Sequence, residues 1–207
     1  MCYNKLTSIG AWIFAVVVGL YLYKRNKNYD RWNAGFILVF TLVQFSEAGI
    51  WDALDKENQT QNELFTKGIL LILFAQPFIQ SYLGHTNTKS NVLKYLSVLY
   101  AALLTYVLLF RVIGATPGQI YSDKGKGGHL IWHDKKTPTS FMGGYGIGVI
   151  YLIGILFPLF FAGTKGIPLL AVGVISALIS FMVAKKGEFG SLWCIYAVFY
   201  GVVALVL

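Results

Sequence analysis

The stretch WNAGFILVFTLVQFSEAGIWD, which runs from Trp32 to Asp52, decides the fold. It is a nearly unbroken apolar run of the length that a helix needs to cross a bilayer, about 20 residues, and it carries a carboxylate, Glu47, inside it. Because a helix rises about 1.5 Å per residue, Glu47 lies roughly 7 Å from Asp52 along the axis. An ionisable group at that depth is costly and persists mainly where it faces protein or water. We therefore predict a spanning helix whose acidic side chain points into the protein.

Polar residues around Glu47 agree with this prediction. Residues spaced by three and four share one face of a helix, and Thr41, Gln44, Glu47 and Trp51 have that spacing. The stripe is expected to face protein or a water-filled pocket. Neither possibility turns Glu47 toward lipid.

Composition places the whole chain in the membrane. Of its 207 residues, 56% are hydrophobic and only 13% are charged, against about 25% charged in soluble domains. The net charge of +8 comes from residues in short loops between apolar segments. That distribution suits anionic lipid headgroups better than nucleic acid, so the lipid bilayer is the expected partner and nucleic acid is not.

Seven apolar segments have lengths near that of a spanning helix. Short connections favour antiparallel neighbours, so the sequence predicts an all-α integral membrane bundle of seven transmembrane helices in a single domain, residues 1–207. Residues 115–142 form the longest expected extramembrane loop. The segments are Ser8–Tyr23, Asn33–Trp51, Thr66–Leu83, Val92–Gly114, Tyr145–Gly163, Ile167–Ala184 and Ser191–Leu207.

Charge near the helix ends predicts the orientation. The first loop carries Lys24, Arg25, Lys27 and Arg31, against Lys5 before the first helix, which favours an extracytoplasmic amino terminus and a cytoplasmic carboxyl terminus. The acidic second loop agrees, and its residues 58–60 have the form of a glycosylation acceptor. Four lysines in the fourth loop argue the other way.

Residue types that can do chemistry gather on one side. In an alternating bundle the amino terminus and the second, fourth and sixth loops share a face, and most such residues fall near it. Glu47 and Arg111 are candidate catalytic residues, although the two can equally form a structural ion pair that relieves the burial of both charges. The other candidates are the possible metal ligands Cys2, His129, His133 and Cys194.

The cysteines and histidines each allow several interpretations. Cys2 and Cys194 can form a disulfide, stay inert or bind a metal such as zinc. His129 and His133 have the i, i+4 spacing that places two imidazoles on one helical face, as zinc sites use. Glycines before them and Pro138 after them allow only a turn or two of helix. The segment can instead be an interfacial loop that lies over the mouth of the bundle as a lid.

Several short motifs resemble a broad group of small seven-helix membrane proteins whose chains open Met-Cys-Trp-Ser. The matching positions include Met1-Cys2, Glu47, Gln76-Pro77-Phe78, His129-Leu130-Ile131-Trp132 and Trp193-Cys194, while Tyr3 and Asn4 depart from the pattern. The resemblance implies a fold and no activity. Seven helices also resemble microbial rhodopsins, but residues 191–207 contain no lysine for a retinal Schiff base.

Three functions are compatible with these features. The first is a metal-assisted hydrolase that acts on a lipid-like substrate from a polar pocket on one face, with Glu47 as ligand or general base. The second is a structural or assembly subunit whose buried polar groups lock the bundle. The third is a transporter or channel, which needs polar groups at successive depths.

Overall fold

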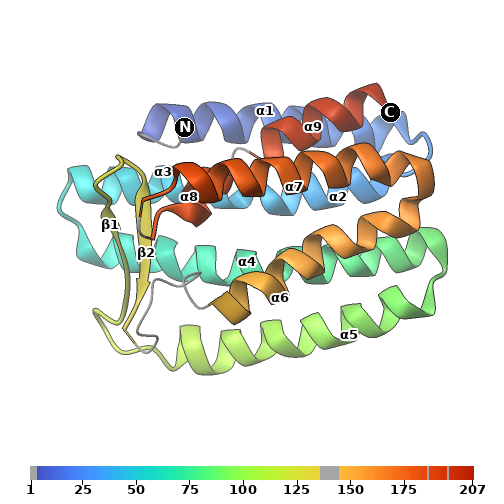
Figure 1. Ribbon diagram of the computed structural model, residues 1–207. Helices are drawn as coiled ribbons and strands as arrows, with labels where there is room; N and C mark the ends of the chain where they lie inside the picture. Colours follow the sequence, from blue (N-terminus) through green and yellow to red (C-terminus); the bar gives the residue numbers. More distant parts are fainter. Residues whose placement is uncertain (1–3, 136–144, 186, 195) are drawn as a thin grey trace.

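The computed structural model describes residues 4–135, 145–185, 187–194 and 196–207 (Figure 1). Helices make up 79% of it, so the expected all-α class is confirmed. The elements are α1 (Lys5–Arg25), α2 (Asp30–Phe40), α3 (Leu42–Asp55), α4 (Gln59–Thr88), α5 (Asn91–Tyr106), the π-helix η1 (Val107–Ile113), β1 (Ile120–Lys124), β2 (Leu130–Asp134), α6 (Tyr145–Leu156), the 3₁₀ segment η2 (Phe157–Lys165), α7 (Gly166–Val183), α8 (Phe189–Trp193) and α9 (Tyr196–Val206).

Six helices among the described residues are long and apolar enough to cross a membrane, as expected of an integral membrane protein. Five of them each correspond to one predicted segment, and one, 148–183, covers the two predicted segments on either side of Gly163. The backbone of Gly163 is left-handed, with φ 58°, and Figure 1 shows the chain turning back between α6 and α7. The six are Lys5–Arg25, Asp30–Asp55, Gln59–Thr88, Asn91–Ile113, Gly148–Val183 and Phe189–Val206.

The decisive stretch forms two helices, α2 and α3, that follow each other across Thr41. Their buried aromatic rings pack against α8 and α9. The Phe40 ring lies 5.6 Å from that of Tyr196, and Tyr196 stacks on Trp193 at 5.0 Å. Because rings bury much apolar area and pack edge to face or offset, this cluster joins the second apolar segment to the last.

Side chains of α4 and α5 pack directly against α6 at one glycine. A Cβ added at Gly154 would lie 2.5 Å from the Tyr100 ring and 2.6 Å from Cβ of Pro77. Tyr100 also donates its hydroxyl hydrogen bond to the Ile150 carbonyl at 2.7 Å. The tyrosine side chain therefore ties α5 to α6 beside Gly154.

The fourth loop differs from the expected irregular segment, because it contains an antiparallel β-hairpin in which Ile120 pairs with Asp134 and Lys124 with Leu130. In Figure 1 the hairpin stands across one end of the bundle, beside α3, α4 and α8. We call this end, with the α3–α4 turn and the α7–α8 connection, the capped end. The α1–α2 turn, the α4–α5 turn and η2 form the opposite end.

Candidate functional site

Strand β1 is fixed to α4 by buried hydrogen bonds. Asn62 Nδ2 donates to the Ser122 carbonyl at 2.9 Å, and the Ser122 amide donates to Asn62 Oδ1 at 2.8 Å. The hydroxyl groups of Thr66 and Ser122 are 2.7 Å apart. The Asn62 side chain thus pairs with the strand backbone as a neighbouring strand would, and it satisfies groups that burial would otherwise make costly.

The hairpin turn is fixed to the α7–α8 connection by Glu188, which is only 1% exposed. The Gly127 amide donates to Glu188 Oε1 at 2.6 Å. A Cβ at either Gly125 or Gly127 would lie 2.1 Å from a Glu188 carboxylate oxygen. Glycine is therefore required at both turn positions for the carboxylate to reach the backbone.

The two histidines are separated by the strand. His129 precedes β2 and is 3% exposed, whereas His133 stacks on Tyr121 and its Nε2 lies 3.3 Å from Asp123 Oδ2. Four residues of extended chain span roughly 13 Å. The prediction of a shared helical face was wrong, because strand pairing to β1 overrides the i, i+4 pattern; the lid-like placement over the bundle is what the structure has.

Burial lowers the pKa of His129 below its ordinary value, and the nearby Glu188 carboxylate opposes this shift. A buried imidazole is easier to hold neutral than charged, since desolvation disfavours the ion. His129 is therefore a neutral group within the covered end of the bundle near neutral pH.

The stripe around Glu47 lies inside the protein, as predicted. Thr41, Gln44 and Glu47 are each no more than 1% exposed, and Trp51 is 6% exposed. Gln44 Nε2 donates to the carbonyl of Cys194 at 2.5 Å, which links α3 to the segment between α8 and α9. Glu47 therefore occupies a sealed position between helices.

Cys194 is also buried, and its thiol lies 3.3 Å from the Gly190 carbonyl. Cys2 lies outside the described residues, so a link between the two cysteines stays a prediction. Among the described residues, no three His, Cys, Asp or Glu side chains come together as a metal site requires. A zinc site and a hydrolytic role for Glu47 also stay predictions, which metal analysis of the purified protein would test.

Arg111 forms an ion pair with Asp134 of β2, and the Asp134 side chain is fully buried. Among the described residues, Asp134 is the carboxylate within ion-pair distance of Arg111, so the structure gives no support to the alternative pairing with Glu47. Gln119 Nε2 approaches the other Asp134 oxygen at 3.4 Å. Arg111 lies in the π-helix η1, an irregularity that often marks functional sites.

Polar groups continue toward the opposite end, where the sequence pattern did not predict them. Tyr200 donates to Asn33 Oδ1 at 2.7 Å, and Trp32 Nε1 donates to Gln80 Oε1 at 3.0 Å. The polar groups of Trp32 and Asn33, at the start of the decisive stretch, were the available sign of this polar interior. Their partners come from distant helices, and no local spacing reveals such pairs.

At the opposite end, the Arg25 guanidinium links α1 to α9. It is paired with the buried Asp30 at 2.7 Å. It also donates to the carbonyls of Leu205 and Ala204, at 2.6 and 3.0 Å. These carbonyls belong to the last turn of α9, where a cation is favourable.

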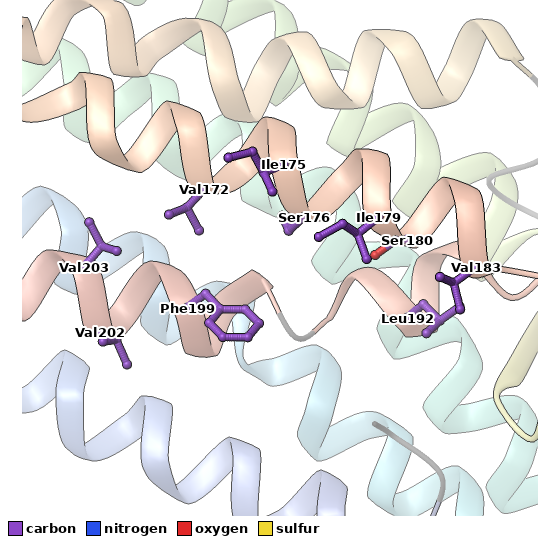
Figure 2. Close-up of a pocket in the computed structure, with 10 residues that line it drawn as sticks. All are labelled: Val172, Ile175, Ser176, Ile179, Ser180, Val183, Leu192, Phe199, Val202 and Val203. Atoms are coloured by element: carbon purple, nitrogen blue, oxygen red, sulfur yellow. The ribbon is translucent and has the colours of Figure 1, made fainter.

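Two cavities lie on the flanks of the bundle, away from Glu47. The larger is a groove of about 580 Å³ between α7 and the α8–α9 segment (Figure 2). Its walls are almost entirely hydrocarbon, with two serines among the lining residues. The smaller, about 170 Å³, lies between α4, α5–η1 and α6 and is lined in part by Arg111.

In comparisons with known proteins, no family model, no curated protein and no solved structure matches the chain.

Proposed function

We propose that the chain is a seven-crossing integral membrane protein that binds the hydrocarbon chains of bilayer lipids, and that its polar interior serves to hold the bundle together. The observation that carries the proposal is the groove between α7 and α9 (Figure 2). A pocket of about 580 Å³ falls within the range of ligand sites, about 300–1,000 Å³. The groove lies along two helices that each belong to a candidate spanning segment.

The side chains of the groove suit a hydrocarbon occupant. Its apolar lining includes Val172, Ile175, Ile179, Phe199, Val202 and Val203. Ile175 is 56% exposed and Ile179 also 56%, so the groove is open at its side. Ser176, which lines it too, accepts from Trp193 Nε1 at 2.9 Å and donates to the Gly173 carbonyl at 3.0 Å. Its hydroxyl is used within the protein, so Ser176 offers little polarity to a ligand.

A lipid chain fits this groove better than a second copy of the protein does. Helices that associate within membranes approach closely through small residues at the contact. Here the small residues Ser176 and Ser180 are buried at the base of the groove, and larger residues such as Ile175 and Ile179 form its exposed sides. Flexible acyl chains can fill such a furrow, whereas a straight helix would meet the protruding side chains.

Hydrogen bonding inside the bundle favours a structural role for the buried polar groups over a transport path. Gln76, Gln80, Asn33 and Gln44 lie at successive depths, yet each takes part in a hydrogen bond with another helix or with the backbone beyond its own helix. Groups held in this way stabilise one arrangement of helices.

Seven crossings are supported by the turn at Gly163. A Cβ at Gly166 would lie 1.8 Å from the Leu159 carbonyl oxygen, so the chain reverses tightly there. With seven crossings and the basic first loop inside, the capped end is extracytoplasmic and the carboxyl terminus cytoplasmic. An impermeant maleimide applied to intact cells, with Cys2 replaced by serine, should label Lys126→Cys and not Lys27→Cys. The reverse pattern would invert the orientation, and labelling of both would refute an odd number of crossings between residues 27 and 126.

Lipid binding in the groove can be tested with a phospholipid that carries a photoreactive group in its acyl chain. We expect crosslinks to residues of α7 and α9, strongly reduced in Val202→Trp because the indole fills the groove. Val206→Trp is the matched control, since Val206 lies one turn further along α9 and is 85% exposed. Equal crosslinking in both variants would contradict the proposal, as would crosslinks between two copies of the chain at Val202→Cys.

A further inference from the structure

The smaller cavity differs from the groove because it combines hydrocarbon walls with a cation. Its apolar lining includes Leu70, Phe74, Leu103 and Val107. At about 170 Å³, it is slightly larger than the apolar cavity of roughly 150 Å³ that admits benzene in an engineered protein. Tyr106, which is 52% exposed, lies at its rim, so the cavity reaches the flank of the bundle.

The cation is Arg111, the one charged side chain among the described residues that line the cavity. Its side chain is 19% exposed, and it lies two residues from the end of the spanning segment Asn91–Ile113. Ionisable groups in such segments are costly and usually functional. The ion pair with Asp134 uses Nη2, while the buried Nε has no hydrogen-bond partner among the described residues.

Position along the helix gives the cavity a polar and an apolar end. Eleven residues separate Tyr100 from Arg111, a distance of roughly 16 Å at 1.5 Å per residue. The Tyr100 hydroxyl is already bonded to the Ile150 carbonyl at 2.7 Å. Arg111 therefore provides the available donor near the membrane surface, and the inner end toward Pro77 is hydrocarbon.

We propose that this cavity binds a single-chain amphiphile with an anionic head, a carboxylate or a phosphate. The head bonds the Arg111 guanidinium beneath the hairpin, and the chain follows α5 inward and leaves past Tyr106 into the bilayer. A guanidinium has five N–H donors and can bond a ligand while it keeps Asp134.

Binding can be measured with three probes of equal chain length: hexadecanoic acid, hexadecyl phosphate and the neutral hexadecanol. Purified protein in detergent should bind at least one of the two anions about tenfold more tightly than the alcohol, since a charge-assisted hydrogen bond supplies that difference. Whichever anion binds more tightly identifies the head as carboxylate or phosphate. Equal affinity for the alcohol would overturn the proposal.

Variants then locate the site. Leu103→Trp fills the cavity without touching the ion pair and should weaken anion binding about tenfold. Ile150→Trp, from the α6 wall, serves as a second blocking variant if the first does not fold. Leu99→Trp is the matched control on the same helix, because Leu99 is 52% exposed and does not line the cavity.

Arg111→Lys keeps the charge and loses the planar fork, so it should reduce affinity for the anion and leave hexadecanol unaffected. Val202→Trp, which blocks the α7–α9 groove, should bind the anion as tightly as the wild type does. The proposals for the two sites are therefore tested independently. Unchanged anion binding in folded Leu103→Trp and Ile150→Trp would place the ligand elsewhere and refute the proposal.

Discussion

Asn62 and Ser122 are joined twice, because the asparagine amide donates to the serine carbonyl and accepts from the serine amide. A helix side chain thus takes the place of a third strand beside β1. The two bonds link residues that are 60 positions apart and lie in different kinds of structure. They define where the hairpin sits on the bundle.

Replacing Asn62 with alanine should therefore loosen the hairpin. The change removes two buried hydrogen bonds and leaves the Ser122 amide and carbonyl without these partners, at a cost of about 2–4 kcal/mol. We expect a lower thermal midpoint in detergent and faster proteolysis between residues 115 and 135. Asn87→Ala, on the exposed end of the same helix, should change neither; similar effects of both variants would show that Asn62 has no special role.

Glu188 should be more sensitive to truncation than to loss of charge. Glu188→Ala leaves the Gly127 amide without its acceptor and should destabilise the protein by about 1–3 kcal/mol. Glu188→Gln keeps an oxygen at that position and should cost less. Chemical denaturation of the two variants compares the losses, and a glutamine variant as unstable as the alanine variant would show that the charge, not the hydrogen bond, matters.

Stability should fall in mild acid because of His129. Its folded-state pKa lies below the unfolded value, about 6.5. As the pH falls below 6.5, the unfolded chain takes up a proton more readily than the buried imidazole does. The free energy of unfolding therefore decreases. Thermal midpoints measured between pH 7 and pH 5 should therefore decline, and His129→Gln should flatten the decline. His133→Gln, on the outer face of the hairpin, should retain it; a wild type whose midpoint rises in acid would contradict the assignment.

Alanine substitutions at two glycines should have opposite signs. Gly10 lies in α1 with nothing within 4 Å of an added Cβ, so Gly10→Ala should stabilise the helix by up to about 1 kcal/mol. At Gly154 the same gain competes with overpacking against Tyr100 and Pro77, which typically costs about 1–3 kcal/mol. Because the ring and the proline have little freedom to move, we expect a net loss. Thermal unfolding of the pair decides, and a stabilised Gly154→Ala would show that α6 can shift.

Structural features that depend on a single segment of sequence could be predicted. The apolar runs gave the membrane class and the approximate helix bounds, and the spacing of Thr41, Gln44 and Glu47 gave the buried face. The hairpin was missed because His129 and His133 fit a helical spacing, whereas the alternation of buried Leu130, Trp132 and Asp134 with less buried neighbours has a period of two. That alternation was the available signal.

Partners could not be predicted, because they depend on which helices become neighbours. Arg111 and Glu47 have compatible charges and comparable depth, yet the hairpin brings Asp134 to the arginine. The same holds for the flank cavities, since residues that are exposed on an isolated helix become a groove only when a second helix stands beside them.

The contact between Arg25 and the last turn of α9 bears on how the chain is inserted into a membrane. Helices α1 and α2 leave the ribosome long before α9 is translated, so Arg25, at the end of α1, and Asn33, in α2, are synthesised before the carbonyls and the hydroxyl that later bond them. The early intermediate must keep these groups near water or in contact with the insertion machinery. These hydrogen bonds can therefore form only after α9 has been inserted.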